Sequence, residues 1–219
     1  MKIAIIGAGN IGGNLTRRLT ALGHEVAVAN SRSPETLADL AAETGATAVR
    51  ATEAAQGADL VIVTIPQKRI PDLPKGILDG AAPEVPVIDT GNYYPKERDG
   101  LVEAIEEGEP ESQWVQRHLG RPVIKAFNGI YAQYLLDRHL PAGSPGRIAL
   151  PVAGDDAAAK AKVMALVDEL GFDPVDAGGL DQSWRQQPGT PVYGAEVDAD
   201  GVRAALAAAP PERPSHFRA

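Results

Sequence analysis

The sequence predicts an α/β fold with a doubly wound, mostly parallel sheet. Short β-rich runs alternate with helical patterns from the first residue to about residue 176. The run at 3–6 is wholly apolar, as expected of a strand that helices cover on both faces, and the run at 59–65 gives the strongest strand signal. Because strands and helices alternate, neighbouring strands are expected to run parallel with right-handed crossovers.

The chain divides into a predicted domain at 1–180 and a C-terminal extension at 181–219. Strands are expected over residues 3–6, 25–29, 46–49, 59–65, 86–89, 122–127, 147–153 and 173–176, and helices over 11–22, 34–43, 157–170 and 201–209, with a short helix ending near residue 57. The C-terminal extension is short, irregular and rich in Pro and Gly. We expect it to act as a lid or as a dimer contact.

Composition excludes several classes of function. The formal net charge is −8, so an acidic surface would repel a phosphate backbone, and no nucleic-acid partner is expected. The chain has no cysteine, which excludes disulfides and thiolate chemistry. No stretch is long and apolar enough for a membrane span or a signal peptide, so a cytoplasmic protein is expected.

A glycine-rich segment follows the first strand directly and opens the first helix. It reads Gly7-Ala8-Gly9-Asn10-Ile11-Gly12 and fits G-x-G-x-x-G in the strand–turn–helix context that this pattern requires. Gly7 would make the tight turn, Gly9 would let the backbone approach a pyrophosphate, and Gly12 would permit close packing of helix on strand. The helix N-terminus would offer free N–H groups to the phosphates. The segment therefore predicts a Rossmann-type dinucleotide site.

The tip of the second strand indicates which dinucleotide is bound. Units that bind NAD usually carry Asp or Glu there, which accepts a hydrogen bond from the ribose 2′-hydroxyl. This chain reads Asn30-Ser31-Arg32-Ser33 and has no carboxylate at that place. Arg32 offers a planar set of donors suited to a phosphate, with hydroxyls and an amide beside it. NADP is thus favoured over NAD, and the alternative is that Arg32 is only a solvated charge.

Three later strands end in residues that we expect at the same edge of the sheet. Ile65 and Pro66 are placed to pack on the cofactor. Asn92 and Asn128 are placed to bond the nicotinamide or a second substrate, or else to cap their own turns. Lys125 is the one candidate acid at a strand tip, with a stabilising surface lysine as the alternative. Lys125 and Asn128 are therefore the candidate catalytic residues.

The rest of the sequence offers little acid–base chemistry. The four histidines are far apart, there is no H-E-x-x-H or G-x-S-x-G, and no metal site is predicted. Reduction of a carbonyl requires a proton donor beside the hydride. Hydride exchange with a flavin-like ring depends mainly on stacking the two rings at the right distance. The pattern therefore favours a flat-ring electron acceptor as the second substrate.

Several segments together resemble the NADPH:F420 oxidoreductase family. They are Gly7–Gly12, Asn30–Arg32, Thr64–Pro66, Val123–Asn128, Val152–Asp156 and Asp176–Leu180. The same fold core occurs in the reductase domain of the STEAP metalloreductases and in the N-terminal domain of pyrroline-5-carboxylate reductases. The resemblance covers about residues 1–180. It implies an enzyme, an NADP-dependent oxidoreductase that transfers a hydride between NADPH and a deazaflavin (coenzyme F420) or a flavin, usually as a homodimer.

The resemblance also implies where the cofactor lies. The residues that would hold NADP are Gly7, Gly9, Asn10, Ile11, Ser31 and Arg32. Ile65 and Asn92 would line the middle of the cofactor, and the segment from Lys125 to Asn128, which includes Ala126, would border the nicotinamide end.

Two other functions stay open on the sequence. One is an NADPH-dependent reductase of a small carbonyl or imine, with Lys125 or Tyr93 as proton donor. The other is a non-catalytic NADP-binding sensor or scaffold. A tail folded over the nicotinamide cleft would favour the sensor, whereas an open, partly aromatic pocket would favour an enzyme.

Overall fold

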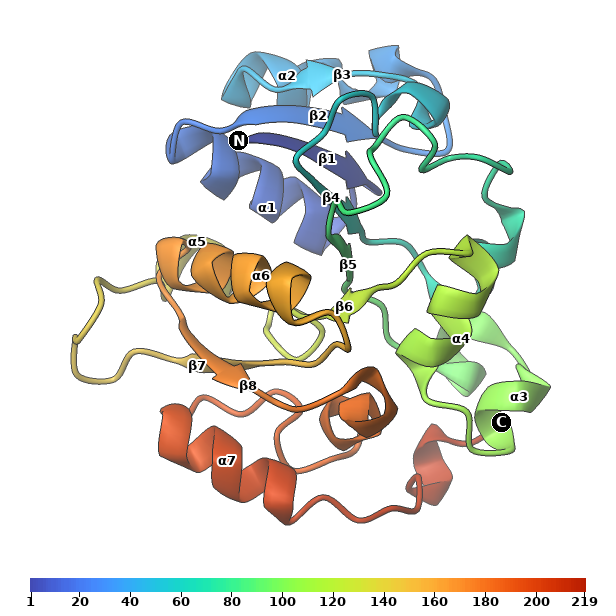
Figure 1. The fold of residues 1–219 in the computed structure, drawn as a ribbon, viewed down its shortest axis with the longest axis vertical. Coiled ribbons are helices and arrows are strands. Elements are labelled where there is room, and N and C mark those ends of the chain that lie inside the picture. Colours follow the sequence, from blue (N-terminus) through green and yellow to red (C-terminus); the bar gives the residue numbers. More distant parts are fainter.

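The computed structural model describes residues 1–219 and is built on a six-stranded sheet in which every neighbouring pair is parallel (Figure 1). The strand order is β3-β2-β1-β4-β5-β6. The strands are β1 (Lys2–Ile6), β2 (Glu25–Ala29), β3 (Thr47–Ala48), β4 (Leu60–Val63), β5 (Val87–Asp89) and β6 (Ile124–Lys125). This order is that of the doubly wound dinucleotide-binding fold, so the predicted fold class is confirmed.

Two further strands form a small sheet of their own. β7 (Ala149–Val152) and β8 (Asp173–Asp176) pair in parallel. A single antiparallel bridge joins this pair to the main sheet, where the backbone N–H groups of Lys125 and Ala153 donate to each other's carbonyl oxygens at 2.8 and 3.1 Å. The small sheet therefore extends the edge of the main sheet beyond β6 in the opposite direction.

The helices cover both faces of the sheets (Figure 1). They are α1 (Asn10–Ala21), α2 (Ala38–Thr44), α3 (Glu103–Glu106), α4 (Glu111–Leu119), α5 (Tyr134–Asp137), α6 (Ala157–Glu169) and α7 (Ala199–Ala207). The helix predicted over 34–43 is divided into a 3-10 turn at Pro34–Leu37 and α2, and the one expected before Gly57 is only a 3-10 turn at Ala51–Glu53. No helix has both the length and the apolar character needed to cross a membrane.

Alternate residues of the central strands fill two separate cores. Ile3 and Ile5 of β1 belong to the core that α1, α5 and α6 share, whereas Ala4 and Ile6 face the core beneath α4. All four side chains are at most 2% exposed. This explains why the first strand is apolar at every position rather than at every second one.

The C-terminal extension packs on its own chain. Val202 and Leu206 of α7 share a small core with Ala149 of β7 and Val175 of β8. The last residue lies beside α3, where the backbone N–H of Ala219 donates to Glu106 Oε1 at 2.9 Å (Figure 1). The extension therefore covers the β7–β8 sheet and then returns to α3 and α4.

Two glycines set the distance between α1 and the sheet. Gly7 has a φ of +115°, a conformation that favours glycine. A Cβ on Gly12 would lie 1.9 Å from the carbonyl oxygen of Gly7 and 2.7 Å from Cγ2 of Thr64. A side chain at position 12 would therefore push the helix away from β1 and β4.

We expect Gly12→Ala to lower the free energy of unfolding by roughly 1–3 kcal/mol, because the added methyl group overpacks the contact between helix and strand. Gly9→Ala is the matched control, since a Cβ on Gly9 meets nothing within 4 Å. Urea denaturation of the two variants checks this expectation. Equal stability of Gly12→Ala and the wild type would show that α1 can move outward at no cost.

Candidate functional site

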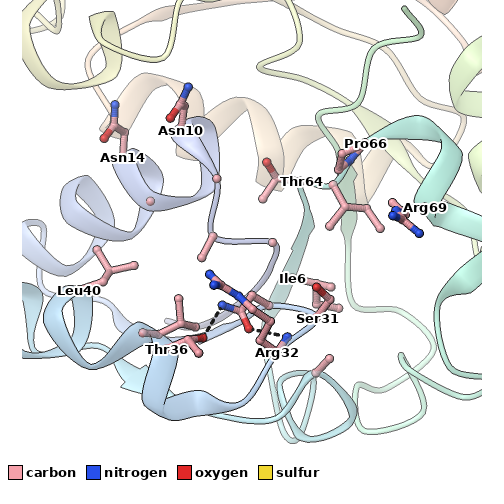
Figure 2. Close-up of a pocket in the computed structure, with 18 of the residues that line it drawn as sticks. Ile6, Asn10, Asn14, Ser31, Arg32, Thr36, Leu40, Thr64, Pro66 and Arg69 are labelled. Carbon is pink, nitrogen blue, oxygen red and sulfur yellow. Dashed lines mark hydrogen bonds between the residues drawn. The ribbon is translucent and has the colours of Figure 1, made fainter. Parts of the chain in front are cut away.

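A cavity of about 1460 Å³ lies at the carboxyl ends of β1, β2 and β4 (Figure 2). Eight of the predicted cofactor residues line this cavity, namely Gly7, Gly9, Asn10, Asn30, Ser31, Arg32, Ile65 and Pro66. They come from three different strand tips and from the start of α1. The strand order brings these tips together at the switch point of the sheet, where doubly wound folds bind their ligands.

The N-terminus of α1 is suited to an anion. Gly9 occupies the N-cap position, so no side chain caps the helix, and the first turn carries no acidic residue. The N–H groups of that turn have no partner within the helix and point along the positive end of its dipole. Because the space around Gly9 is open, a ligand phosphate can approach the backbone closely. The residues present therefore fit a pyrophosphate.

The tip of β2 forms a tight turn organised by Asn30. Asn30 Oδ1 accepts the backbone N–H of Arg32 at 2.8 Å, and Asn30 Nδ2 donates to Thr36 Oγ1 at 2.9 Å (Figure 2). The amide of Asn30 is thus used within the chain, and its part is to shape the turn rather than to offer free donors. The guanidinium of Arg32 and the hydroxyl of Ser31 have no partner in the protein and line the cavity. They are free to bind a phosphate.

The cavity also contains residues that the sequence did not single out. Arg50 follows β3 and lines the same cavity without an ion pair. Applying the strand-tip rule to the third strand would have found it. Arg69, on the turn after Pro66, pairs with Asp72 at 3.0 Å. The sequence carried no signal for Arg69, because its place depends on the fold of the 3-10 turn at Gln67–Asp72.

Asn92 and Asn128 do not line the cavity, contrary to expectation. Asn92 Nδ2 donates to the carbonyl oxygen of Asn128 at 2.8 Å, and Asn128 Nδ2 donates to Asn92 Oδ1 at 3.1 Å. Asn128 Nδ2 also donates to the carbonyl oxygen of Gln186 at 2.6 Å, while Gln186 Nε2 donates to Asn128 Oδ1 at 3.0 Å. These two asparagines thus connect the tips of β5 and β6 to the C-terminal extension, and they bond to each other and to Gln186 rather than cap their own turns.

Three other predicted cofactor residues also lie outside the cavity lining. Ile11 packs its side chain against the core that α1 covers, and Gly12 is buried at the contact with Gly7. Ala126 is fully buried in the same core. Ala126 therefore has no exposed side chain to offer a ligand, whereas Ile11 and Gly12 determine how α1 packs on the sheet.

Lys125 is neither a surface lysine nor a group that faces the cavity. Its side chain is fully buried, and Nζ donates to the carbonyl oxygen of Gly91 at 2.6 Å. Nζ also lies 3.5 Å from Asp89 Oδ2 and 3.9 Å from Glu111 Oε2. Both sequence-based readings of Lys125 need correction. The polar neighbours that hold this lysine inside the protein come from β5 and α4.

Glu111, at the start of α4, completes a buried cluster of charges. Its Oε1 accepts from Nη2 of Arg213 at 2.6 Å, and its Oε2 accepts the backbone N–H of Tyr93 at 3.2 Å. Burial raises the pKa of the Glu111 carboxyl, and the cations Lys125 and Arg213 oppose that rise. The charge cluster (Asp89, Glu111, Lys125 and Arg213) pairs two carboxylates with two cations. Through Arg213 it holds the C-terminal extension against the strand tips.

Tyr93, the other candidate proton donor, also uses its hydroxyl for hydrogen bonds within the protein. Its ring is buried, and its hydroxyl donates to the carbonyl oxygen of Gly100 at 3.0 Å and accepts the backbone N–H of Val102 at 3.1 Å. Burial raises the pKa of Tyr93. Tyr93 therefore fixes the loop between β5 and α3.

A parallel sheet of this order, with an anion-receptive helix end at its switch point, belongs to the class of Rossmann-type dinucleotide-binding proteins. A family model described as "NADP oxidoreductase coenzyme F420-dependent" matches residues 2–93. The chain is similar to the protein SMa0349 of Sinorhizobium meliloti, with 32% identity, a TM-score of 0.74, and coverage of 89% of this chain and 94% of that one. The chain belongs to the family of coenzyme F420-dependent NADP oxidoreductases.

Two other relatives complete the comparison. A proposed F420-dependent NADP reductase from Arthrobacter sp. FB24 is 26% identical, with a TM-score of 0.67 and coverage of 84% of this chain and 87% of that one. The protein YjhV of Escherichia coli (strain K12) is 53% identical over 60 residues, which are 27% of this chain and 44% of that protein. The alignment thus spans less than half of this curated relative.

Removing Arg213 tests the charge cluster. We expect Arg213→Ala to lower the free energy of unfolding by about 3–5 kcal/mol, because two buried carboxylates would then share one cation. Arg203→Ala is the control, since Arg203 pairs with Asp200 on the exposed side of α7 and should change stability by less than about 0.5 kcal/mol. Chemical denaturation measures both variants. If they are equally stable, Arg213 contributes nothing to holding the extension.

Proposed function

We propose that this chain binds NADP(H) in the cavity at the strand tips and transfers a hydride between its nicotinamide and a flat-ring acceptor, such as a deazaflavin (coenzyme F420) or a flavin. The observation that carries the cofactor assignment is the unpaired guanidinium of Arg32 in a cavity that also holds the uncapped end of α1. A helix end suits the pyrophosphate, and a free arginine at the tip of β2 suits a phosphate on the adenosine ribose.

The chain's own residues would bind and orient the cofactor. The backbone at Gly9 and Asn10 would hold the pyrophosphate, while Ser31 and Arg32 would hold the 2′-phosphate. Ile65 and Pro66 would pack against the middle of the dinucleotide. When bound, NADPH supplies the hydride, and the protein supplies position.

The structure supports the two alternative functions, a carbonyl or imine reductase and a non-catalytic sensor, to different degrees. A reductase of small carbonyls or imines loses both proton donors considered for it, since Lys125 and Tyr93 are buried and bonded within the protein. The sensor keeps one observation in its favour, because Gln186 of the C-terminal extension lies on Asn128 at the tip of β6. Turnover with an acceptor is what separates the sensor from the proposed enzyme.

Arg32→Ala tests the cofactor assignment. We expect NADPH binding to weaken by about 1.5–3 kcal/mol, which corresponds to roughly 10- to 150-fold in Kd, because a charge-assisted hydrogen bond is lost. NADH binding should change little, and Arg203→Ala on the distant helix α7 should leave both unchanged. Isothermal titration calorimetry measures all of these affinities. Equal weakening of NADPH and NADH would contradict the assignment of Arg32 to the 2′-phosphate.

A panel of acceptors tests the reaction. With NADPH and a set of flavins, deazaflavins and small carbonyls, we expect absorbance at the reduced-nicotinamide band to fall for a flat-ring acceptor. A response to carbonyls alone would support the alternative reductase. No response from any acceptor, together with tight binding of NADPH, would support the sensor.

A further inference from the structure

A second cavity lies where the C-terminal extension meets the loop between α3 and α4. Its volume is about 350 Å³, which falls within the range of roughly 300–1,000 Å³ that is typical of small-molecule sites. The residues that line it come from three segments, 105–110, 184–190 and 210–218. None of them lines the cavity at the strand tips. The second cavity is therefore separate from the site proposed for the dinucleotide.

Hydrogen bonds join the segments that form the walls of the second cavity. Arg213 Nη2 donates to Glu111 Oε1 at 2.6 Å, directly after the 105–110 segment, and to Gln187 Oε1 at 3.0 Å. The backbone N–H of Ala219 donates to Glu106 Oε1 at 2.9 Å. The three segments are thus held to one another by direct contacts, and the cavity between them is part of the packed structure.

Two hydrogen-bond donors in the wall of the second cavity have no partner. Nε2 of Gln187 and Nη1 of Arg213 are both buried and make no hydrogen bond within the protein. Gln187 as a whole is 7% exposed. Buried N–H groups are nearly always bonded, because an unbonded one loses its hydration without compensation. The bond between Arg213 Nη2 and Gln187 Oε1 keeps the two side chains adjacent, so both donors call for an oxygen acceptor in the same place.

Much of the remaining wall is apolar. Trp184 and Ile105 contribute apolar side chains, and five prolines contribute their rings. Flat, rigid surfaces of this kind pack well against another ring. A water molecule can satisfy a donor but gains nothing from an apolar wall. The second cavity therefore fits a ligand that combines an oxygen acceptor with an apolar ring.

The charges around the second cavity disfavour an anion. Three glutamates line it but only two arginines. One of these arginines, Arg213, is already balanced by the buried Glu111, and one of the glutamates, Glu109, is balanced by Arg117. Two carboxylates and one guanidinium remain, so a negatively charged ligand would meet a net negative charge. A neutral carbonyl oxygen satisfies the two donors without that repulsion.

We propose that the second cavity binds a small neutral amide that carries an apolar ring. The carbonyl oxygen of the ligand accepts from Gln187 Nε2 and Arg213 Nη1, and its ring packs against Trp184 and the prolines. The N–H group of the amide donates to a glutamate of the wall. This inference goes beyond the proposed hydride transfer and does not rest on it. A ligand bound here contacts the extension and the α3–α4 loop together, so it stabilises their packing.

Three probes of similar shape and different charge test the site. The full-length protein, labelled with ¹⁵N, is titrated with benzamide, benzoate and benzamidine, and the indole N–H signal of Trp184 reports binding. Trp114, the other of the two tryptophans, does not line the cavity and serves as the internal reference. We expect benzamide to shift the Trp184 signal saturably. Benzoate and benzamidine should bind at least roughly 5-fold more weakly, since the first is an anion and the second has no acceptor.

Gln187→Glu removes one of the two donors with little change of shape. The variant keeps an oxygen for Arg213 and replaces Nε2 with a second acceptor, so the Kd for benzamide should rise roughly 10-fold or more. Gln56→Glu is the matched control, because Gln56 is exposed and lines neither cavity. The same change of charge there should leave the Kd unchanged. Thermal unfolding shows whether each variant is folded.

Saturating NADP⁺ should leave the Kd for benzamide unchanged, because the two cavities share no residue. Competition between them would place the amide at the strand tips and overturn the site. The proposal also fails if benzamide leaves the Trp184 signal in place, if all three probes bind equally, or if Gln187→Glu binds benzamide as the wild type does. Tighter binding of benzoate than of benzamide would contradict a neutral ligand.

Discussion

The contact between α1 and the sheet is the constraint on which both fold and site depend. With no side chain at Gly12, the helix lies directly against Gly7 and Thr64, and its first turn therefore lies at the tips of β1 and β4. The same approach that packs the core brings unpaired backbone N–H groups to the switch point of the sheet. The packing of the core and the proposed binding of a pyrophosphate thus depend on one arrangement of backbone atoms.

The sequence predicted the parts of the site that depend on local pattern. The Gly7–Gly12 segment and the Arg32 turn are read within a few residues, and the structure places most of their residues around one cavity. The buried strands β1 and β4 were also evident, because apolar runs covered on both faces are distinctive. These features require no knowledge of distant contacts.

The remaining parts depend on contacts between distant residues, which local patterns do not reveal. Lys125 looked like a strand-tip lysine, but Glu111 and Asp89 hold it inside the protein. Glu111 lies on α4, a short helix that was not predicted from the sequence, and its second cation comes from Arg213 in the C-terminal extension. Asn92 and Asn128 were placed correctly at strand tips, yet their amides bond to each other and to Gln186. The homodimer implied by the family resemblance stays a prediction.

The charge cluster links the final residues of the chain to the middle of the sheet. Glu111 is fully buried and receives one of its two cations from the extension, so neither partner can be exchanged alone without leaving an uncompensated charge in the interior. The residues of the extension and of the β5–β6 edge that form this cluster are therefore expected to evolve together. In a chimaera built from two homologues, a junction placed between these two segments would have to preserve the pairing of position 111 with position 213. A substitution at either position would restrict which residue types the other position tolerates.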